Sequence, residues 1–113
     1  MSYVSMTRPG TARGPHEHRE QTDYFCFFGD FRLSLWDNRK GSATYGEKMV
    51  LDTQGRPYIA IVPPGVVHAY KNKGLSDGLV VNMPDRLFRG REKSSPVDEV
   101  RYEDEPESPF RID

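Results

Sequence analysis

The sequence contains a single cysteine, Cys26, among its 113 residues. One thiol cannot build an internal disulfide framework, so packing and hydrogen bonds must hold the fold together. No apolar run is long enough to cross a bilayer, and no segment has the pattern of a signal peptide. We therefore expect a cytoplasmic protein that does not contact a membrane.

An excess of charge of either sign is also lacking. The 16 basic and 17 acidic side chains leave a net charge of −1 and are interspersed along most of the chain. Because nucleic-acid binding relies on clustered Lys and Arg, this pattern argues against a nucleic-acid partner. A chain of 113 residues is one domain, small enough for a homodimer to bury useful additional surface.

Helical periodicity is absent as well, because no long stretch repeats apolar side chains at a spacing of 3.6 residues. The 9 prolines and 10 glycines separate short alternating runs. These runs predict strands at residues 3–6, 16–18, 24–28, 31–36, 48–51, 58–62, 67–70 and 78–83. The run 24–28 is apolar at every position, which is typical of a strand covered on both faces. About eight short strands predict an all-β fold, a double-sheet jelly roll.

The strand at 67–70 follows a turn with a strong sequence signal. The Pro-Pro-Gly run at 63–65 fixes φ near −65° at the second position of a type II turn, and Gly65 supplies the positive φ of the third. His68 and Tyr70 lie two residues apart in the strand that follows, so they share one strand face. The side chains of His68 and Tyr70 are therefore expected to point in the same direction from the strand that follows the turn.

All three histidines of the chain fit one pattern. His16 and His18 form a His-x-His pair followed by Asp23, while His68 follows Pro-x-Gly and precedes Asn72. This arrangement resembles the two-part cupin motif, with Asp23 in place of the usual glutamate. The resemblance implies a double-stranded β-helix, or jelly-roll barrel, whose three histidines face one cavity.

Three longer runs are similar to a narrower family, the dTDP-4-dehydrorhamnose 3,5-epimerases, which are sugar-nucleotide isomerases. They are residues 5–16, 37–46 and 63–68. The resemblance covers roughly residues 3–85 and implies an isomerase acting on carbohydrates. In that family the histidine of Arg-Gly-x-His removes a proton next to a 4-keto group and its arginine contacts the nucleotide phosphates, roles that would fall on His16 and Arg13. A neutral imidazole suits such a proton transfer at pH 7.

The family's two catalytic helpers have no counterpart in this sequence. The position of its lysine falls at about Asp23 and that of its tyrosine at about Val81. We also expect the family's N-terminal segment, which lies ahead of the strand that begins here at residue 3, to be missing. Tyr70 is a candidate replacement acid, with a tyrosine that only fills the barrel as the alternative. The candidate catalytic residues are therefore His16, His68 and Tyr70.

The carboxylate in place of the lysine suggests a metal. His16, His18, Asp23 and His68 would supply three nitrogens and one oxygen, a set suited to divalent zinc, iron, nickel, copper or manganese. Gln21 is an alternative to Asp23. Such a metal would restore the lost positive charge and act as a Lewis acid. The other alternative is that no metal binds, as in the ordinary epimerases, and Asp23 orients a histidine.

Residues 1–90 contain all of these motifs and are expected to form the barrel. Beyond Pro84 the chain loses its alternation and becomes polar, and we expect residues 91–113 to form an acidic tail on the barrel or on a neighbouring subunit. Its expected anchors are Val100, Tyr102, Phe110 and Ile112.

The sequence thus favours a sugar-nucleotide epimerase or isomerase, with a small-molecule sugar nucleotide as its substrate. Two alternatives remain open. One is a metal-dependent cupin of another reaction class, such as an oxygenase or a metal-assisted isomerase. The other is a non-catalytic carbohydrate-binding cupin, because a fold is shared by proteins of many functions.

Overall fold

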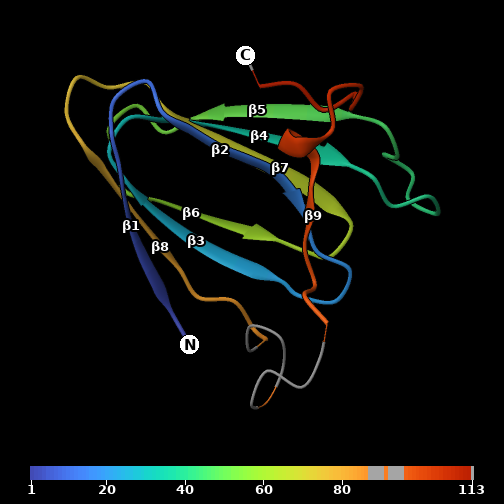
Figure 1. Cartoon of the computed structure of the whole chain (residues 1–113). Helices are drawn as coiled ribbons and strands as arrows, with labels where there is room; N and C mark the ends of the chain where they lie inside the picture. The colour runs from blue at the N-terminus through green and yellow to red at the C-terminus, as the bar shows by residue number, and fades with distance from the viewer. Residues whose placement is uncertain (87–90, 92–95, 113) are drawn as a thin grey trace.

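The computed structural model describes residues 1–86, 91 and 96–112. These residues form two antiparallel sheets that pack face to face (Figure 1). Sheet A has the strand order β1 (Tyr3–Thr7), β8 (Gly78–Asn82), β3 (Asp23–Phe28) and β6 (Tyr58–Val62). Sheet B has the order β5 (Lys48–Asp52), β4 (Phe31–Asp37), β7 (Val66–Asn72), β2 (Ala12–Glu17) and β9 (Val100–Arg101). The predicted all-β, cupin-type jelly roll is confirmed.

Most strands follow the predicted runs closely, but β2 begins at Ala12 and ends at Glu17, so His18 lies in the loop after the strand and not within it. The short 3-10 helix η2 (Tyr102–Asp104) follows β9, and the described residues contain no α-helix. No helix in this part of the chain is therefore long enough to span a membrane. Strand β9 was not predicted, because a two-residue strand in a polar, acidic segment has no alternation to detect.

The inner faces of the two sheets form the core. In β3 the buried side chains are Phe25 and Phe27, which alternate with the exposed Tyr24 and Phe28. The prediction that residues 24–28 are covered on both faces is therefore wrong for the described residues. The run is apolar throughout because the outward positions of sheet A are apolar too, although no described residue packs over them as a second layer.

The outer face of sheet B is covered by the tail, by which we mean residues 96–112. Tyr102, Phe110 and Ile112 pack against Trp36, Val67 and Ala69, which lie on the outside of β4 and β7. Figure 1 shows this C-terminal segment crossing sheet B. The proposed boundary at residues 90 and 91 borders segments outside the described residues and stays a prediction.

Candidate functional site

The site is built where β2 and β7 pair. His16 lies directly opposite His68 in the register of these two strands, so both residues belong to the same face of sheet B. The turn before β7 has the predicted form, because Gly65 has φ +82° and the Val66 N–H donates to the carbonyl of Pro63 at 3.3 Å. The Gly65 N–H also donates to the carbonyl of His18 at 2.9 Å, which ties His18 to the turn.

Gly14 allows β2 and β7 to approach one another beside the two histidines. The register of β2 shifts between Arg13 and His16, and Gly14 lies within this irregularity with φ +93°. A Cβ atom at this position would come within 2.7 Å of the carbonyl oxygen of His68. Both the positive φ and the lack of space therefore require glycine here.

Three of the predicted ligands form one compact group. Asp23, at the start of β3 in sheet A, lies close to His68 on β7 of sheet B and to His18 in the loop that follows β2. Its Oδ2 lies 3.1 Å from Nε2 of His18 and 3.4 Å from Nε2 of His68. The candidate ligand atoms of these three residues lie within 4.8 Å of one another. Asp23 is only 1% exposed, so its carboxylate depends on these neighbours for stabilisation.

Burial and hydrogen bonding give the two imidazoles opposite charge states. Burial lowers the pKa of His68 to about 4, so His68 is neutral at pH 7. Burial alone would also lower the pKa of His18, but hydrogen bonds to Asp23 and to the carbonyl of Asp98 outweigh it and raise that pKa to about 9. Burial likewise opposes ionisation of Asp23, yet the bond to His18 keeps the pKa of Asp23 below its usual range. A charged pair thus lies beside a neutral imidazole.

His16 lies beside this group but outside it. Its Nδ1 is 3.2 Å from Glu99 Oε1 and its Nε2 is 2.5 Å from Glu103 Oε1, two carboxylates of the tail. The centroid of its ring is 6.2 Å from that of His68. The structure therefore brings together His18, Asp23 and His68, but not the four-residue ligand set that the sequence analysis predicted. The strand face that His16 shares with His68 does not determine the rotamer of the His16 side chain.

The structure places Tyr70 in the core. It is 7% exposed and its ring packs within 5.3–6.0 Å, between centroids, of Phe25, Phe27 and Phe31. Burial raises its pKa. These contacts fit a tyrosine that only fills the barrel better than they fit a general acid that reaches a substrate. Arg13, in contrast, is exposed, and its Nη2 donates to the carbonyl of Met6 at 3.5 Å.

The residue that faces the site from β8 is Asn82, not Val81. Val81 lies opposite Cys26 and Val4, on the outer face of sheet A. Asn82 donates from Nδ2 to Asp23 Oδ1 at 3.1 Å, while its own buried Oδ1 has no partner among the described residues. Asn82 was not predicted, because only the neighbouring position Val81 was considered on this strand and it lies on the opposite strand face.

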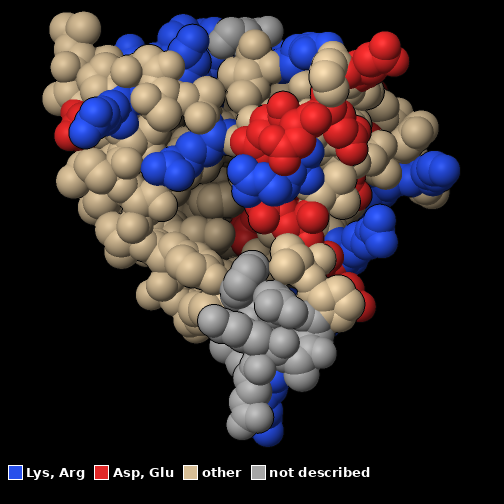
Figure 2. Space-filling view, in the orientation of Figure 1, with Lys and Arg blue, Asp and Glu red and all other residues tan. Residues whose placement is uncertain are grey.

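Gln21 and Asp98 support the loop that carries His18. The Gln21 Nε2 donates to Asp23 Oδ1 at 2.6 Å. The Asp98 carboxylate accepts from the backbone N–H groups of Arg19, Glu20 and Gln21 at 2.8–3.0 Å. Asp98, Glu99 and Glu103 all belong to the tail, and their only signal in the sequence was its acidic composition. Figure 2 shows a hollow on this face, beside the charged side chains that gather over β9 and η2.

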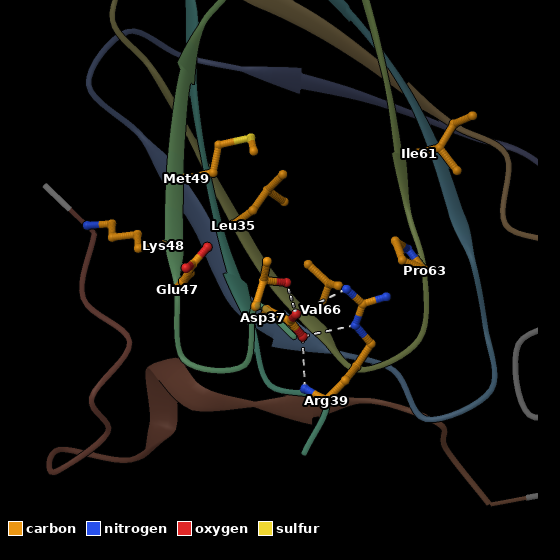
Figure 3. A pocket seen from close by; sticks show the side chains of 10 residues that line it. Leu35, Asp37, Arg39, Glu47, Lys48, Met49, Ile61, Pro63 and Val66 are labelled. Atoms are coloured by element: carbon orange, nitrogen blue, oxygen red, sulfur yellow. Dashed lines mark hydrogen bonds and ion pairs between the residues drawn. The ribbon is translucent and has the colours of Figure 1, made fainter. Parts of the chain in front are cut away.

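A cavity of about 260 Å³ lies beside β4, β5 and β6 (Figure 3). At its edge, Asp37 accepts hydrogen bonds from the backbone and guanidinium of Arg39 and from the hydroxyls of Ser42 and Thr44. The Arg39 guanidinium and the two hydroxyls hold the pKa of Asp37 well below its usual range. The run 37–46, which carried much of the family resemblance, is therefore a loop folded around one carboxylate.

No family model matches the chain. Among curated proteins it is 36% identical over 94 residues to the probable low-salt glycan biosynthesis epimerase Agl13 of Haloferax volcanii, a match that covers 78% of this chain and 58% of that protein. Among solved structures it superposes on a dTDP sugar isomerase from Desulfovibrio desulfuricans G20 with a TM-score of 0.77 and 25% identity, over 98% of this chain and 69% of that one. The chain has the cupin fold of the dTDP-4-dehydrorhamnose 3,5-epimerases.

A second solved structure shares this fold. The dTDP-4-dehydrorhamnose 3,5-epimerase from Sulfolobus tokodaii matches with a TM-score of 0.63 and 25% identity, over 76% of this chain and 51% of that one. The epimerase-like chain described here thus spans about half to two thirds of the length of these relatives.

Proposed function

We propose that this epimerase-like cupin is a sugar-nucleotide epimerase in which His16 is the general base. The observation that carries the proposal is the position of His16, beside His68 and with a carboxylate at each ring nitrogen. The relatives described above include an epimerase of glycan biosynthesis and a dTDP sugar isomerase. Abstraction of a proton next to a keto group requires a base of this kind.

The two carboxylates have different roles in this proposal. Glu99 immediately precedes β9, which pairs with β2, so Glu99 is held next to Nδ1 of His16 by the sheet itself. A proton on Nδ1 donated to Glu99 leaves the lone pair of Nε2 to take the proton of the substrate, and the Glu99 carboxylate stabilises the imidazolium that forms. Glu103 is 30% exposed on the short helix η2, and it moves aside from Nε2 when substrate binds.

Arg13 is the proposed contact for the phosphates of the nucleotide. It lies on the same strand as His16, is exposed, and has a guanidinium that suits bidentate binding of phosphate oxygens. Because Tyr70 is buried in the core, the polar groups of the barrel that would face the substrate are those around Asp23. A sugar nucleotide would thus bind with its phosphates outside and its sugar toward the histidines.

We also propose that His18, Asp23 and His68 bind a divalent metal, namely zinc, iron, nickel, copper or manganese. Because the Val66 carbonyl can only accept, Nδ1 of His68 carries the proton of this neutral ring. The lone pair of His68 Nε2 then faces Asp23 Oδ2 at 3.4 Å, and a metal bound here would replace the proton that His18 Nε2 shares with Asp23 Oδ2 at 3.1 Å. Such a metal would supply the positive charge that a lysine supplies in the family.

We further propose that the protein works in the cytoplasm, where sugar nucleotides are made and used, and that it forms a homodimer. Self-association is supported by the edge of β1, which pairs with no further strand of the described residues, and by the exposed apolar side chains of sheet A.

The test is exchange of the α-proton of a dTDP-4-keto-6-deoxyhexose with solvent deuterium, followed by proton NMR. The wild-type chain is expected to catalyse the exchange, and His16→Ala is expected to lose on the order of 10²–10⁴ in rate. Glu107→Gln, an exposed tail position, serves as the matched control. Failure of the wild type to exchange, or full exchange by His16→Ala, would overturn the assignment.

A further inference from the structure

Asn82 has a buried side-chain oxygen without a hydrogen-bond donor. Its Nδ2 donates to Asp23 Oδ1 at 3.1 Å, whereas its own Oδ1 has no partner among the residues that the structure describes. Buried polar atoms in folded proteins nearly always have a partner, so an orphaned oxygen indicates a functional role or a bound species. The question is which species the Asn82 oxygen binds.

Asn82 adjoins the group of His18, Asp23 and His68 from the side of β8. It lies opposite Phe25 in the register of β8 and β3, and the Phe25 ring is 5.4 Å from that of His68, between centroids. Asp23 precedes Phe25 by two positions, so the two side chains share one strand face. Asn82 therefore faces the same interior space as the two histidines.

The hydrogen bonds of Asp23 fix which end of the Asn82 amide is left over. Asp23 Oδ1 accepts from Gln21 Nε2 at 2.6 Å as well as from Asn82 Nδ2. A carboxylate can only accept, so turning the Asn82 amide over would place two oxygens against one another. The proton of His18 Nε2 lies 3.1 Å from the other oxygen, Asp23 Oδ2. The donors of this group thus serve Asp23, and the Asn82 oxygen remains an acceptor.

We propose that Asn82 Oδ1 is the fourth protein ligand of a divalent cation, in the place that His16 was expected to take. The inference rests on the proposed metal site of His18, Asp23 and His68. The cation would then be held by two imidazole nitrogens, one carboxylate oxygen and one amide oxygen. Carbonyl and carboxylate oxygens suit Mn²⁺, whereas Zn²⁺ is usually held by thiolate, imidazole or carboxylate. Among the five candidate ions, Asn82 therefore favours manganese.

The pairing of the two side chains is compatible with this role. The bond from Asn82 Nδ2 to Asp23 Oδ1 can persist while Asp23 Oδ2 and Asn82 Oδ1 bind the cation, because it uses the other atom of each group. A hydrogen bond of this kind holds a ligating carboxylate in its orientation. Binding would release the proton that His18 shares with Asp23, since a ligating imidazole nitrogen must be deprotonated.

The experiment measures the dissociation constants of Mn²⁺ and Zn²⁺ by isothermal titration calorimetry on metal-free wild type, Asn82→Ala and Gln21→Ala. Gln21→Ala is the matched control, because it removes a donor to the same oxygen of Asp23. Loss of a donor alone should weaken both ions by a similar factor. Loss of a ligand oxygen should weaken Mn²⁺ by about 10-fold more than Zn²⁺, and we expect this result for Asn82→Ala only.

Equal losses for the two ions in Asn82→Ala would show that Asn82 acts only through its N–H groups. An unchanged Mn²⁺ affinity would show that Oδ1 binds no cation. Either result overturns the inference and leaves the metal site of the other three residues standing, whereas a wild type that binds neither ion overturns both. None of these titrations needs a sugar nucleotide, so the inference can fail while the proposed epimerase activity holds.

A second measurement covers the case in which Asn82→Ala does not fold. The asparagines of the chain are Asn38, Asn72 and Asn82, so wild type labelled with ¹³C at the asparagine side-chain carbonyl gives three NMR signals. Adding Zn²⁺, which is diamagnetic, should shift the signal of Asn82. The signal of Asn72, whose amide is bound to Thr7 and Ser76, should stay in place. Binding of Zn²⁺ without a shift of any asparagine signal would overturn the inference.

Discussion

Glu103 holds its Oε1 2.5 Å from Nε2 of His16, although the two residues are 87 positions apart in the chain. Arg101 lies 3.4 Å from the same carboxylate oxygen, so η2 and β9 together present a charged cluster at the opening of the site. In the free chain the proposed base is therefore covered by the protein's own tail. A substrate with a diphosphate must displace this carboxylate and overcome its negative charge.

Replacing Glu103 by alanine should consequently help the substrate to bind. We expect Glu103→Ala to lower KM severalfold while kcat changes little, because the variant removes a competitor for Nε2 and one repulsive charge. Steady-state exchange kinetics would measure both constants, with Glu107→Gln as the control for a charge lost elsewhere in the tail. A large fall in kcat would show instead that Glu103 supports the reaction.

Glu99 should behave in the opposite way. Glu99→Gln keeps the size of the side chain but removes the charge that stabilises the His16 imidazolium, so we expect kcat to fall about 10-fold or more with KM nearly unchanged. Rescue of the rate by Glu99→Asp, measured in the same assay, would support an orienting carboxylate. Unaltered kcat in Glu99→Gln would remove Glu99 from the mechanism.

The metal proposal predicts a sharp difference among the histidines. His18→Ala and His68→Ala should each lose bound metal, whereas His16→Ala should keep it, since His16 lies outside the group around Asp23. Elemental analysis of the purified variants measures this directly. Adding each of the five proposed ions to the metal-free wild-type protein would measure the affinity of the site for each ion. Loss of metal from His16→Ala alone, or no binding by the wild type, would contradict this ligand set.

Asp37 should make the stability of the fold depend on pH. Because its pKa is held below the usual value near 3.9, its contribution is fully present above that value and is lost as the pH falls through the lower, folded-state pKa. We expect Asp37→Asn to have a lower Tm than the wild type at pH 7, and the gap to narrow as the pH falls from about 4 to 2. Thermal melts monitored by circular dichroism would check this, and a gap independent of pH would exclude the ionised carboxylate as its cause.

The tail should stabilise sheet B through Phe110. Its ring lies 5.6 Å from that of Trp36, between centroids, and 4.7 Å from that of Tyr102. We expect Phe110→Ala to lower the free energy of unfolding by about 1–2 kcal/mol, since Phe110 is half-buried, and to shift the emission of Trp36, the only tryptophan, to longer wavelength. Val97→Ala, at an exposed tail position, should change stability by less than about 0.5 kcal/mol. Equal effects of the two variants would argue against tail packing.

The strands and the turn before His68 could be predicted because the signals for them are local. Alternation fixes which side chains share a face, and Gly65 fixes a turn through its own φ, so residues a few positions apart are sufficient to specify both. The proximity of His18, Asp23 and His68 was expected from the motif resemblance, and their candidate ligand atoms lie within 4.8 Å of one another in the structure. The prediction failed at Val81, where a shift of one position moved the predicted residue to the opposite face.

The contacts of His16 required the tertiary structure. Alternation predicts the face on which the His16 ring lies, but the rotation of the ring depends on which charges surround it, and Glu99 and Glu103 reach it only because the tail crosses sheet B. The packing of the tail on sheet B and not on sheet A likewise required the tertiary structure, since the apolar composition of a strand does not specify which described residues cover it. Periodicity is a property of neighbouring residues, whereas these two features depend on segments separated by most of the chain.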